Sequence, residues 1–177
     1  MNFLSAFRAP SRPEAQWFKV GLTSSFPDLG LDDEDIHNLA HTRPCNSKTA
    51  PGCKVFYVPK DDPSSGKEVP VSENEGAGDM TDQVLVFQRK GTFHAVDHQC
   101  PHSSFPLSQG MPFDIEDFGI VLSAGITCPK HGWSFDLFSG RADRGNYKLK
   151  VWEVQLRDPG GGTSDKEVWV RRKQRIG

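Results

Sequence analysis

CPHSSFPLSQG (residues 100–110) and CPKHGWSFDLFSG (residues 128–140) are the two stretches that decide how this chain of 177 residues folds. Each opens with a cysteine and carries a histidine two or three positions later, which pairs Cys100 with His102 and Cys128 with His131. A proline after each cysteine stiffens the backbone, and nearby glycines allow sharp turns. Two short, preorganised loops that each offer a thiolate and an imidazole predict a metal centre.

The four side chains are compatible with more than one metal centre. Two thiolates and two imidazoles can bind a [2Fe–2S] cluster in which histidines replace two of the cysteines on one iron. In that arrangement Cys100 and Cys128 bind the buried iron, while His102 and His131 bind the outer one. The same ligand set is common in structural zinc sites, so a zinc module is an alternative. Two buried cysteines and two surface histidines without any metal are a third.

The two boxes, with AVDHQCPH running into the first and LKVWEV following the second, resemble those of Rieske ferredoxins and Rieske oxygenases. The opening WFKVGL resembles the first strand of the family, and DIEDF before the second box is similar to the soluble eukaryotic Rieske-type ferredoxins. The resemblance implies an all-β Rieske fold of two antiparallel sheets with a small cluster-binding subdomain at one end. It also implies one Rieske-type [2Fe–2S] cluster per chain, held by Cys100, His102, Cys128 and His131.

Residues next to these ligands shape the loops and the surroundings of the cluster. Ser104 stands where the family usually has glycine, so it is expected to adopt a backbone conformation that glycine adopts freely. Lys130 stands where the family often has tryptophan, and its charge beside His131 is expected to favour the reduced cluster and to offer a docking contact. The candidate residues around the cluster are Pro101, Ser104, Lys130, Gly132 and Trp133.

The residues after the second ligand histidine predict a low redox potential. Respiratory Rieske proteins place serine and tyrosine there, whose hydroxyl groups raise the potential, and carry an additional cysteine in each loop that forms a disulfide. This sequence has Trp133 and Phe135 at the hydroxyl positions and neither additional cysteine. Rieske centres span roughly −150 to +300 mV, and loss of the hydroxyl donors favours the lower end of that range.

These features favour a soluble, monomeric carrier of single electrons, which takes them from an NAD(P)H-dependent flavin reductase and passes them to a terminal oxygenase or hydroxylase. Catalysis would then lie in the partners, and this chain would contribute no catalytic residues. No Gly-x-Gly-x-x-Gly motif follows a strand, so the chain is not expected to bind its own nicotinamide or flavin. One alternative is a subunit of a multicomponent Rieske oxygenase or reductase, and another is a redox or iron sensor.

Strand patterns dominate outside the boxes. They predict strands at 17–22, 53–58, 83–88, 92–96, 150–156 and 167–171, and the last four form two hairpins. We expect a single domain over 1–177 with a cluster-binding subdomain at about 98–140. The polar stretch at about 59–80, rich in proline and glycine, is expected to be a mobile insertion. A short helix is expected from Asp32 or Asp33 to near His41.

Other histidines and cysteines have weaker claims to a function. Asp33, His37 and His41 would share one face of the expected helix, where two histidines and a carboxylate can bind iron, but a solvated helix face is the favoured interpretation. His94 and His98 are read as a strand residue and a loop residue without a predicted role. The remaining two cysteines could pair if geometry permits, although reduced thiols are expected inside a cell; they are Cys45 and Cys53.

The composition argues against several classes of protein. Basic and acidic side chains nearly balance, 21 against 23, so no global attraction to nucleic acid is expected. No apolar run approaches the length of a membrane span. Arg8 and Arg12 near the start are weakly typical of a transit peptide, but Pro10 and Pro13 would interrupt a helix there. The cytoplasm is the expected compartment, with the mitochondrion as the alternative.

Overall fold

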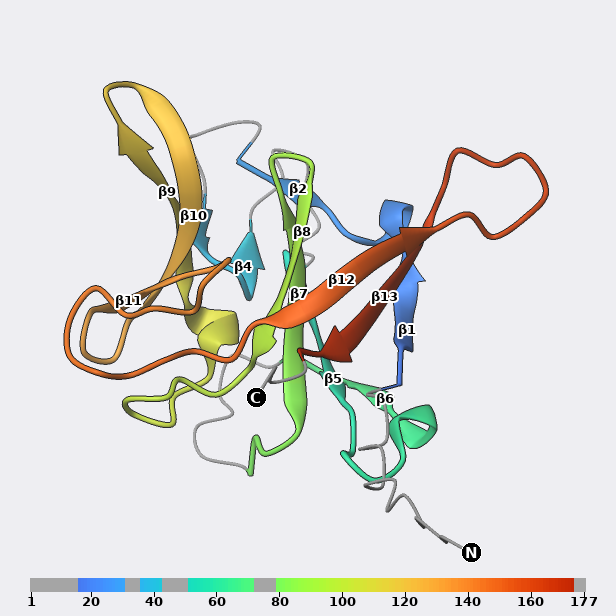
Figure 1. The fold of residues 1–177 in the computed structure, drawn as a ribbon, viewed down its shortest axis with the longest axis horizontal. Helices are drawn as coiled ribbons and strands as arrows, with labels where there is room; N and C mark the ends of the chain where they lie inside the picture. The colour runs from blue at the N-terminus through green and yellow to red at the C-terminus, as the bar shows by residue number, and fades with distance from the viewer. Residues whose placement is uncertain (1–15, 31–35, 43–50, 72–78, 174–177) are drawn as a thin grey trace, which may run out of the picture.

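The fold is built from β-strands. The computed structural model describes residues 16–30, 36–42, 51–71 and 79–173, which contain no α-helix and three short 3₁₀ turns (Figure 1). The prediction of an all-β fold is confirmed. None of the described segments forms a helix with the length and hydrophobicity that a membrane span requires. The elements are β1 (Phe18–Leu22), η1 (Thr23–Ser25), β2 (Asp28–Leu29), β3 (Ile36–Asn38), β4 (His41–Thr42), β5 (Cys53–Tyr57), η2 (Pro63–Ser65), β6 (Lys67–Val69), β7 (Gln83–Arg89), β8 (Thr92–Asp97), η3 (Leu107–Gln109), β9 (Met111–Asp117), β10 (Ile120–Cys128), β11 (Trp133–Asp136), β12 (Trp152–Arg157) and β13 (Glu167–Arg172).

The central sheet separates two hydrophobic cores. Its strands run in the order β2, β7, β5 and β6, and β8 also pairs with β7. Because successive side chains of a strand point to opposite faces, Val84 and Val86 of β7 enter one core while Leu85 and Phe87 enter the other. All four side chains are fully buried, which explains why β7 is apolar along most of its length.

Each core is closed by a second sheet. Figure 1 shows β7 and β8 between the sheet of β1, β13 and β12 on one side and the sheet of β11, β10 and β9 on the other. Val84 and Val86 pack with Trp152, Val168 and other residues of the first of these sheets. The opposite core joins Leu85 and Phe87 to residues of β10 and β11, and it also contains Cys100 and Cys128. The cysteines of both boxes are therefore anchored in the hydrophobic interior.

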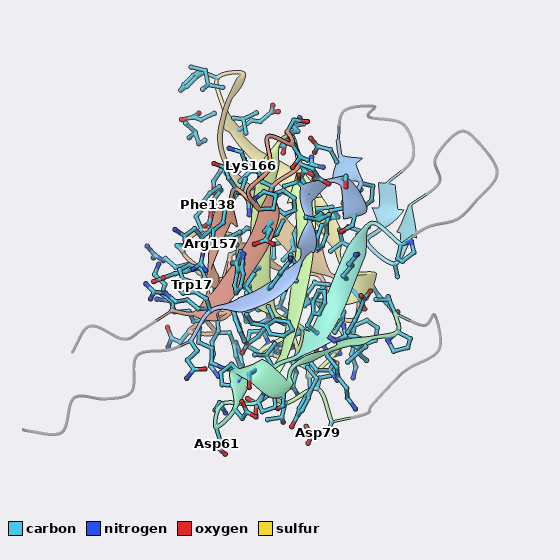
Figure 2. All side chains as sticks on the ribbon, turned by 90° about the vertical axis from the view of Figure 1, so that its right-hand side faces the viewer. Trp17, Asp61, Asp79, Phe138, Arg157 and Lys166 are labelled. Carbon is cyan, nitrogen blue, oxygen red and sulfur yellow. The ribbon has the colours of Figure 1, made fainter. Side chains whose placement is uncertain are left out.

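Both predicted hairpins are confirmed. β7 and β8 are joined by Lys90 and Gly91, whose φ angles of 45° and 77° are those of a tight two-residue turn. β12 pairs with β13, and β1 adds to β13 as the third strand. Arg157 at the end of β12 lies 5.2 Å from the centre of the Trp17 ring, and the two are neighbours in Figure 2. The long glycine-rich loop of this second hairpin is fastened by Asp165, which accepts hydrogen bonds from Thr23 and Ser24.

The helix predicted to end near His41 is wrong. Residues 36–42 form a small hairpin of β3 and β4, so His37 and His41 do not share a helical face, while Asp33 lies outside the described residues. Leu39 at the turn is fully buried. Its N–H donates to the carbonyl of Gly110 at 3.1 Å and its carbonyl accepts from Gly52 at 2.8 Å. The local structure is therefore determined by contacts with distant segments and not by the helical spacing of residues along the chain.

The stretch at about 59–80, expected to be a mobile insertion, contains a short turn and a strand in its described part. Residues 67–69 form β6, which pairs with β5 and places Val69 opposite Val55. Asp62 caps the preceding turn η2 by accepting from the N–H of Ser64 at 3.1 Å. Strand pairing with β5 thus occurs within a stretch whose composition is typical of a loop. Residues 72–78 lie outside the described part of the chain.

The turn between β9 and β10 carries an unfavourable residue. Phe118 and Gly119 have φ angles of 49° and 76°, and the Phe118 side chain is 98% exposed. Asparagine followed by glycine is the preferred pair for such a turn, whereas a bulky residue in this conformation costs on the order of 1 kcal/mol. We therefore expect Phe118→Asn to raise the melting temperature by roughly 2–4 °C. Gly119→Ala, the control, should lower it, and an unchanged or lower value for Phe118→Asn would contradict this account.

Candidate metal centre

The two boxes fold into the same turn. The carbonyl of Cys100 accepts a hydrogen bond from the N–H of Ser104 at 2.9 Å, and the carbonyl of Cys128 accepts one from Gly132 at 3.0 Å. The fifth residue of each box has a positive φ angle, 53° at Ser104 and 68° at Gly132. The prediction that Ser104 adopts a glycine-like conformation is confirmed. The two boxes therefore share one type of turn, although the histidine is its third residue in the first box and its fourth in the second.

The structure brings the two boxes together, with thiols inside and imidazoles outside. Cys100 and Cys128 are each 1% exposed. A hydrogen bond between the two thiols lowers the pKa of Cys100 and raises that of Cys128. His102 is half-buried and His131 is exposed, and their ring centres lie 5.2 Å apart. Ser103 links the boxes, because its Oγ lies 3.7 Å from Sγ of Cys128.

Aromatic rings cover the half-buried imidazole. The ring of Trp133, at the start of β11, stacks on His102 with centres 4.5 Å apart and planes inclined by 22°. Tyr147 approaches both of these rings edge-on at 5.1 Å. Trp133 thus packs directly over a candidate ligand. Stacking of this kind fixes the orientation of the imidazole before any metal binds.

Two residues beyond the second box hold the site and were missed by sequence reasoning. Arg144 lies over the Trp133 ring at 4.9 Å and donates from Nη2 to the carbonyls of Gly132 (2.9 Å) and His131 (3.3 Å). Tyr147 contacts His102, as described above. No local spacing signals either contact, because both arise when the segment after β11 folds back over the second box.

The donor set fits a [2Fe–2S] cluster. Such a cluster takes two protein ligands on one iron and two on the other, so it needs two pairs of side chains instead of four around one point. The described residues hold a buried thiol pair and an imidazole pair whose ring centres lie 5.2 Å apart.

A buried polar atom gives further support for this fit. Nδ1 of His102 is buried without a hydrogen-bond partner in the described part of the structure. Leaving such a nitrogen unsatisfied costs about 1–3 kcal/mol, and a bond to iron would remove that cost. The orphaned atom belongs to one of the four side chains proposed as ligands.

Of the other residues considered from the sequence, His98, Cys53 and Lys130 have described surroundings. His98 contacts Gln83 Oε1 at 2.8 Å through Nδ1 and Ser108 Oγ at 2.9 Å through Nε2, so both ring nitrogens are occupied. Cys53 is a free, buried thiol, and burial raises its pKa to about 12. Cys45 lies outside the described residues. Lys130 is exposed, with its Nζ 5.9 Å from the centre of the Phe105 ring.

His94 is expected to make stability depend on pH. It is 4% exposed on β8 between the rings of Phe87 and Phe138. Burial, aided by the charge of Arg89 and opposed by Asp136, lowers its pKa from 6.5 to about 4. As pH falls, His94 binds a proton in the unfolded chain before it does so in the folded chain. The full contribution of the neutral ring to stability is therefore present above pH 6.5. It is lost as pH falls toward 4, by on the order of 2–3 kcal/mol.

Thermal melting between pH 7.5 and 4.5 tests this expectation. The matched variant is His94→Phe, which keeps an aromatic ring in the pocket and removes the titration. The melting temperature of the variant should fall less than that of the native protein over this range. Equal slopes for the two proteins would show that His94 does not carry the effect.

Comparison with known proteins agrees with this geometry. A family model described as the Rieske [2Fe-2S] domain matches residues 58–153. The Rieske domain-containing protein of Homo sapiens is 36% identical over 96 residues, which cover 53% of this chain and 51% of that protein. The 4beta-methylsterol monooxygenase of Methylococcus capsulatus is 38% identical over 55 residues, which cover 31% of this chain and 12% of the enzyme. The chain thus spans about half or less of the length of these relatives.

A solved structure shares the fold. The crystal structure of a proposed NADH-dependent nitrite reductase small subunit from Mycobacterium tuberculosis matches with a TM-score of 0.50 at 16% identity, covering 91% of this chain and 98% of that one. The family match covers more than half of this chain and includes both boxes with their thiol and imidazole pairs. This chain therefore belongs to the Rieske [2Fe-2S] domain family and carries a Rieske-type [2Fe–2S] cluster.

Proposed function

We propose that this chain carries single electrons from an NAD(P)H-dependent flavin reductase to a terminal oxygenase or hydroxylase. The observation that supports this most directly is the exposure of His131 beside a half-buried His102, while Cys100 and Cys128 are only 1% exposed. The two cysteines would hold the inner iron and the two histidines the outer iron. When bound, the cluster supplies reversible one-electron chemistry. The imidazole edges then offer a partner the shortest approach.

The charges around the exposed histidine suit an acidic partner surface. Lys130 precedes His131 and is exposed, and the guanidinium of Arg144 donates to the carbonyl of His131 at 3.3 Å. Two cations beside an electron exit can steer an acidic surface toward it, and small, transient contacts are typical of electron transfer. The cytoplasm and the monomeric state stay predictions from the sequence.

The expected potential is in the lower half of the Rieske range, although one hydroxyl donor remains. Phe135 is fully buried and, like Trp133, has no hydroxyl to offer. Ser103, from the first box, lies with its Oγ 3.7 Å from Sγ of Cys128. A hydrogen bond to a ligand sulfur raises the potential, so we expect roughly −150 to +50 mV. Ser103→Ala should lower the value further, whereas Ser64→Ala, far from the boxes in the sequence and on an exposed turn, should not change it.

Spectroscopy of protein purified anaerobically tests the proposal. We expect visible absorption that bleaches with dithionite, a Rieske-type EPR signal in the reduced state and about two irons per chain. Electrochemistry would then give the potential of the native protein and of Ser103→Ala. Reduction by NADH and a flavin reductase, followed by reoxidation on addition of an oxygenase-type acceptor, would support the role of carrier. A loaded cluster that no reductase can reduce would contradict it.

A further inference from the structure

A basic cavity lies beside the cluster-binding region, between the end of β8, the start of β12 and the segment before β12. Its volume is about 490 Å³, which is within the range of small-molecule sites. Phe138, which is 54% exposed and is labelled at the edge of the molecule in Figure 2, lies at its wall. The cations that line the cavity are Lys60, Lys148, Lys150, Arg172 and Lys173.

The carboxylates around the cavity do not neutralise these cations. Asp97 is the acidic residue in the lining, and it contacts Lys150 at 3.6 Å. Asp82, behind the wall, contacts Lys60 at 3.2 Å and Arg172 at 2.8 Å. Among the described residues, two carboxylates against five cations leave an excess of three positive charges, although the whole chain has a net charge of −2. A concave surface with such an excess concentrates anions.

The wall is built from groups that are already held in place. Trp152 donates from Nε1 to Asp97 at 2.7 Å, and Arg172 lies 4.3 Å from the centre of the Trp152 ring. Arg172 also donates to the carbonyl of Val58 at 2.8 Å. By contrast, Lys148 and Lys173 are exposed and have no ion-pair partner in the described part of the chain. These two ammonium groups are the ones available to an incoming ligand.

We propose that this cavity binds an oligophosphate, either inorganic or as the phosphate chain of a nucleotide. Lysine binds phosphate as a point charge, and three uncompensated positive charges suit a ligand with several negative ones. The cavity is larger than one phosphate ion requires, and the exposed face of Phe138 offers a planar group a place to stack. This site is separate from the electron-transfer role proposed above and does not depend on it.

Isothermal titration calorimetry on the cluster-loaded protein tests the proposal with three probes in about 0.1 M salt: tripolyphosphate, ATP and adenosine. Tripolyphosphate and ATP should bind one to one, and adenosine should not bind. Lys148→Ala and Lys173→Ala should each weaken binding about fivefold, the value of one ion contact in water. Lys67→Ala is the matched control, since Lys67 is also exposed but lies on β6 and does not line the cavity.

The indole signal of Trp152 in NMR spectra provides a second measurement, because its N–H lies in the cavity wall. It should shift on titration with tripolyphosphate. Equal affinities for tripolyphosphate and ATP would assign the site to phosphate alone, and tighter binding of ATP would assign it to a nucleotide. The proposal is overturned if neither probe binds at millimolar concentration, or if Lys67→Ala weakens binding as much as Lys148→Ala. It is also overturned if only an acidic peptide such as hexaglutamate binds.

Discussion

Replacing Cys128 with alanine is expected to abolish the cluster, whereas replacing Cys53 with alanine should leave about two irons per chain. Both residues are free cysteines with 1% exposure, and both belong to the same hydrophobic core. Burial is therefore the same for the two cysteines, and the difference between them lies in their neighbours. Cys128 shares a hydrogen bond with Cys100 and contacts Ser103, while burial alone raises the pKa of Cys53.

The pair of variants separates loss of a ligand from loss of packing. Each substitution leaves a cavity in the core, so each is expected to cost about 1–2 kcal/mol of stability. Iron analysis and visible absorption of protein purified without oxygen would show whether the cluster is present. Iron retained at the native level in Cys128→Ala would remove Cys128 from the ligand set. Iron lost equally in both variants would mean that core packing, and not ligation, limits assembly.

The strands could be predicted because their signals are local. β7 is apolar along most of its length since it is buried on both faces, and Lys90-Gly91 marks its turn into β8. The small hairpin of β3 and β4 could not be predicted in this way. The spacing of His37 and His41 suggests a helix, but buried Leu39 is bonded to Gly52 and Gly110, which are distant in the sequence.

The same distinction applies to the candidate site. The four proposed ligands lie in two short boxes, and the spacing within each box indicates metal binding. The positive φ angle of Ser104 could be predicted because Ser104 stands where the family usually has glycine. Arg144, Tyr147 and Ser103 could not be anticipated, because their roles depend on how loops pack together. Ser103 places a hydroxyl group 3.7 Å from the sulfur of Cys128, whereas Trp133 and Phe135 have no hydroxyl group.

Asp114→Ala is expected to lower the free energy of unfolding by about 3 kcal/mol, which corresponds to roughly 6–12 °C in melting temperature. Asp114 on β9 is 11% exposed and accepts from Nε of Arg89 at 2.9 Å, and Arg89, at the end of β7, is 8% exposed. Lys90 donates to the other carboxylate oxygen at 2.5 Å. Removing the carboxylate would leave the buried guanidinium without this counter-charge.

The stability that the Asp114–Arg89 ion pair contributes depends on pH, which distinguishes this pair from exposed ion pairs. Burial alone would raise the pKa of Asp114, but the hydrogen bonds from Arg89 and Lys90 lower it overall. Stability from this carboxylate is therefore present above its ordinary pKa near 3.9 and is lost as pH falls below that value. Asp114→Asn should therefore remove this loss of stability at low pH. Glu167→Gln, which breaks the exposed pair with Lys19, should have a much smaller effect on stability.

The location of Asp114 predicts which property of the protein changes. It lies opposite Ala124, in the middle of the β9–β10 ladder, and its contact with Arg89 ties this sheet to the central one. Melting by circular dichroism should thus show a large loss, while the EPR signal and iron content of the folded variant stay native. A loss of iron at temperatures where the variant is folded would show that the cluster loops depend on this anchor.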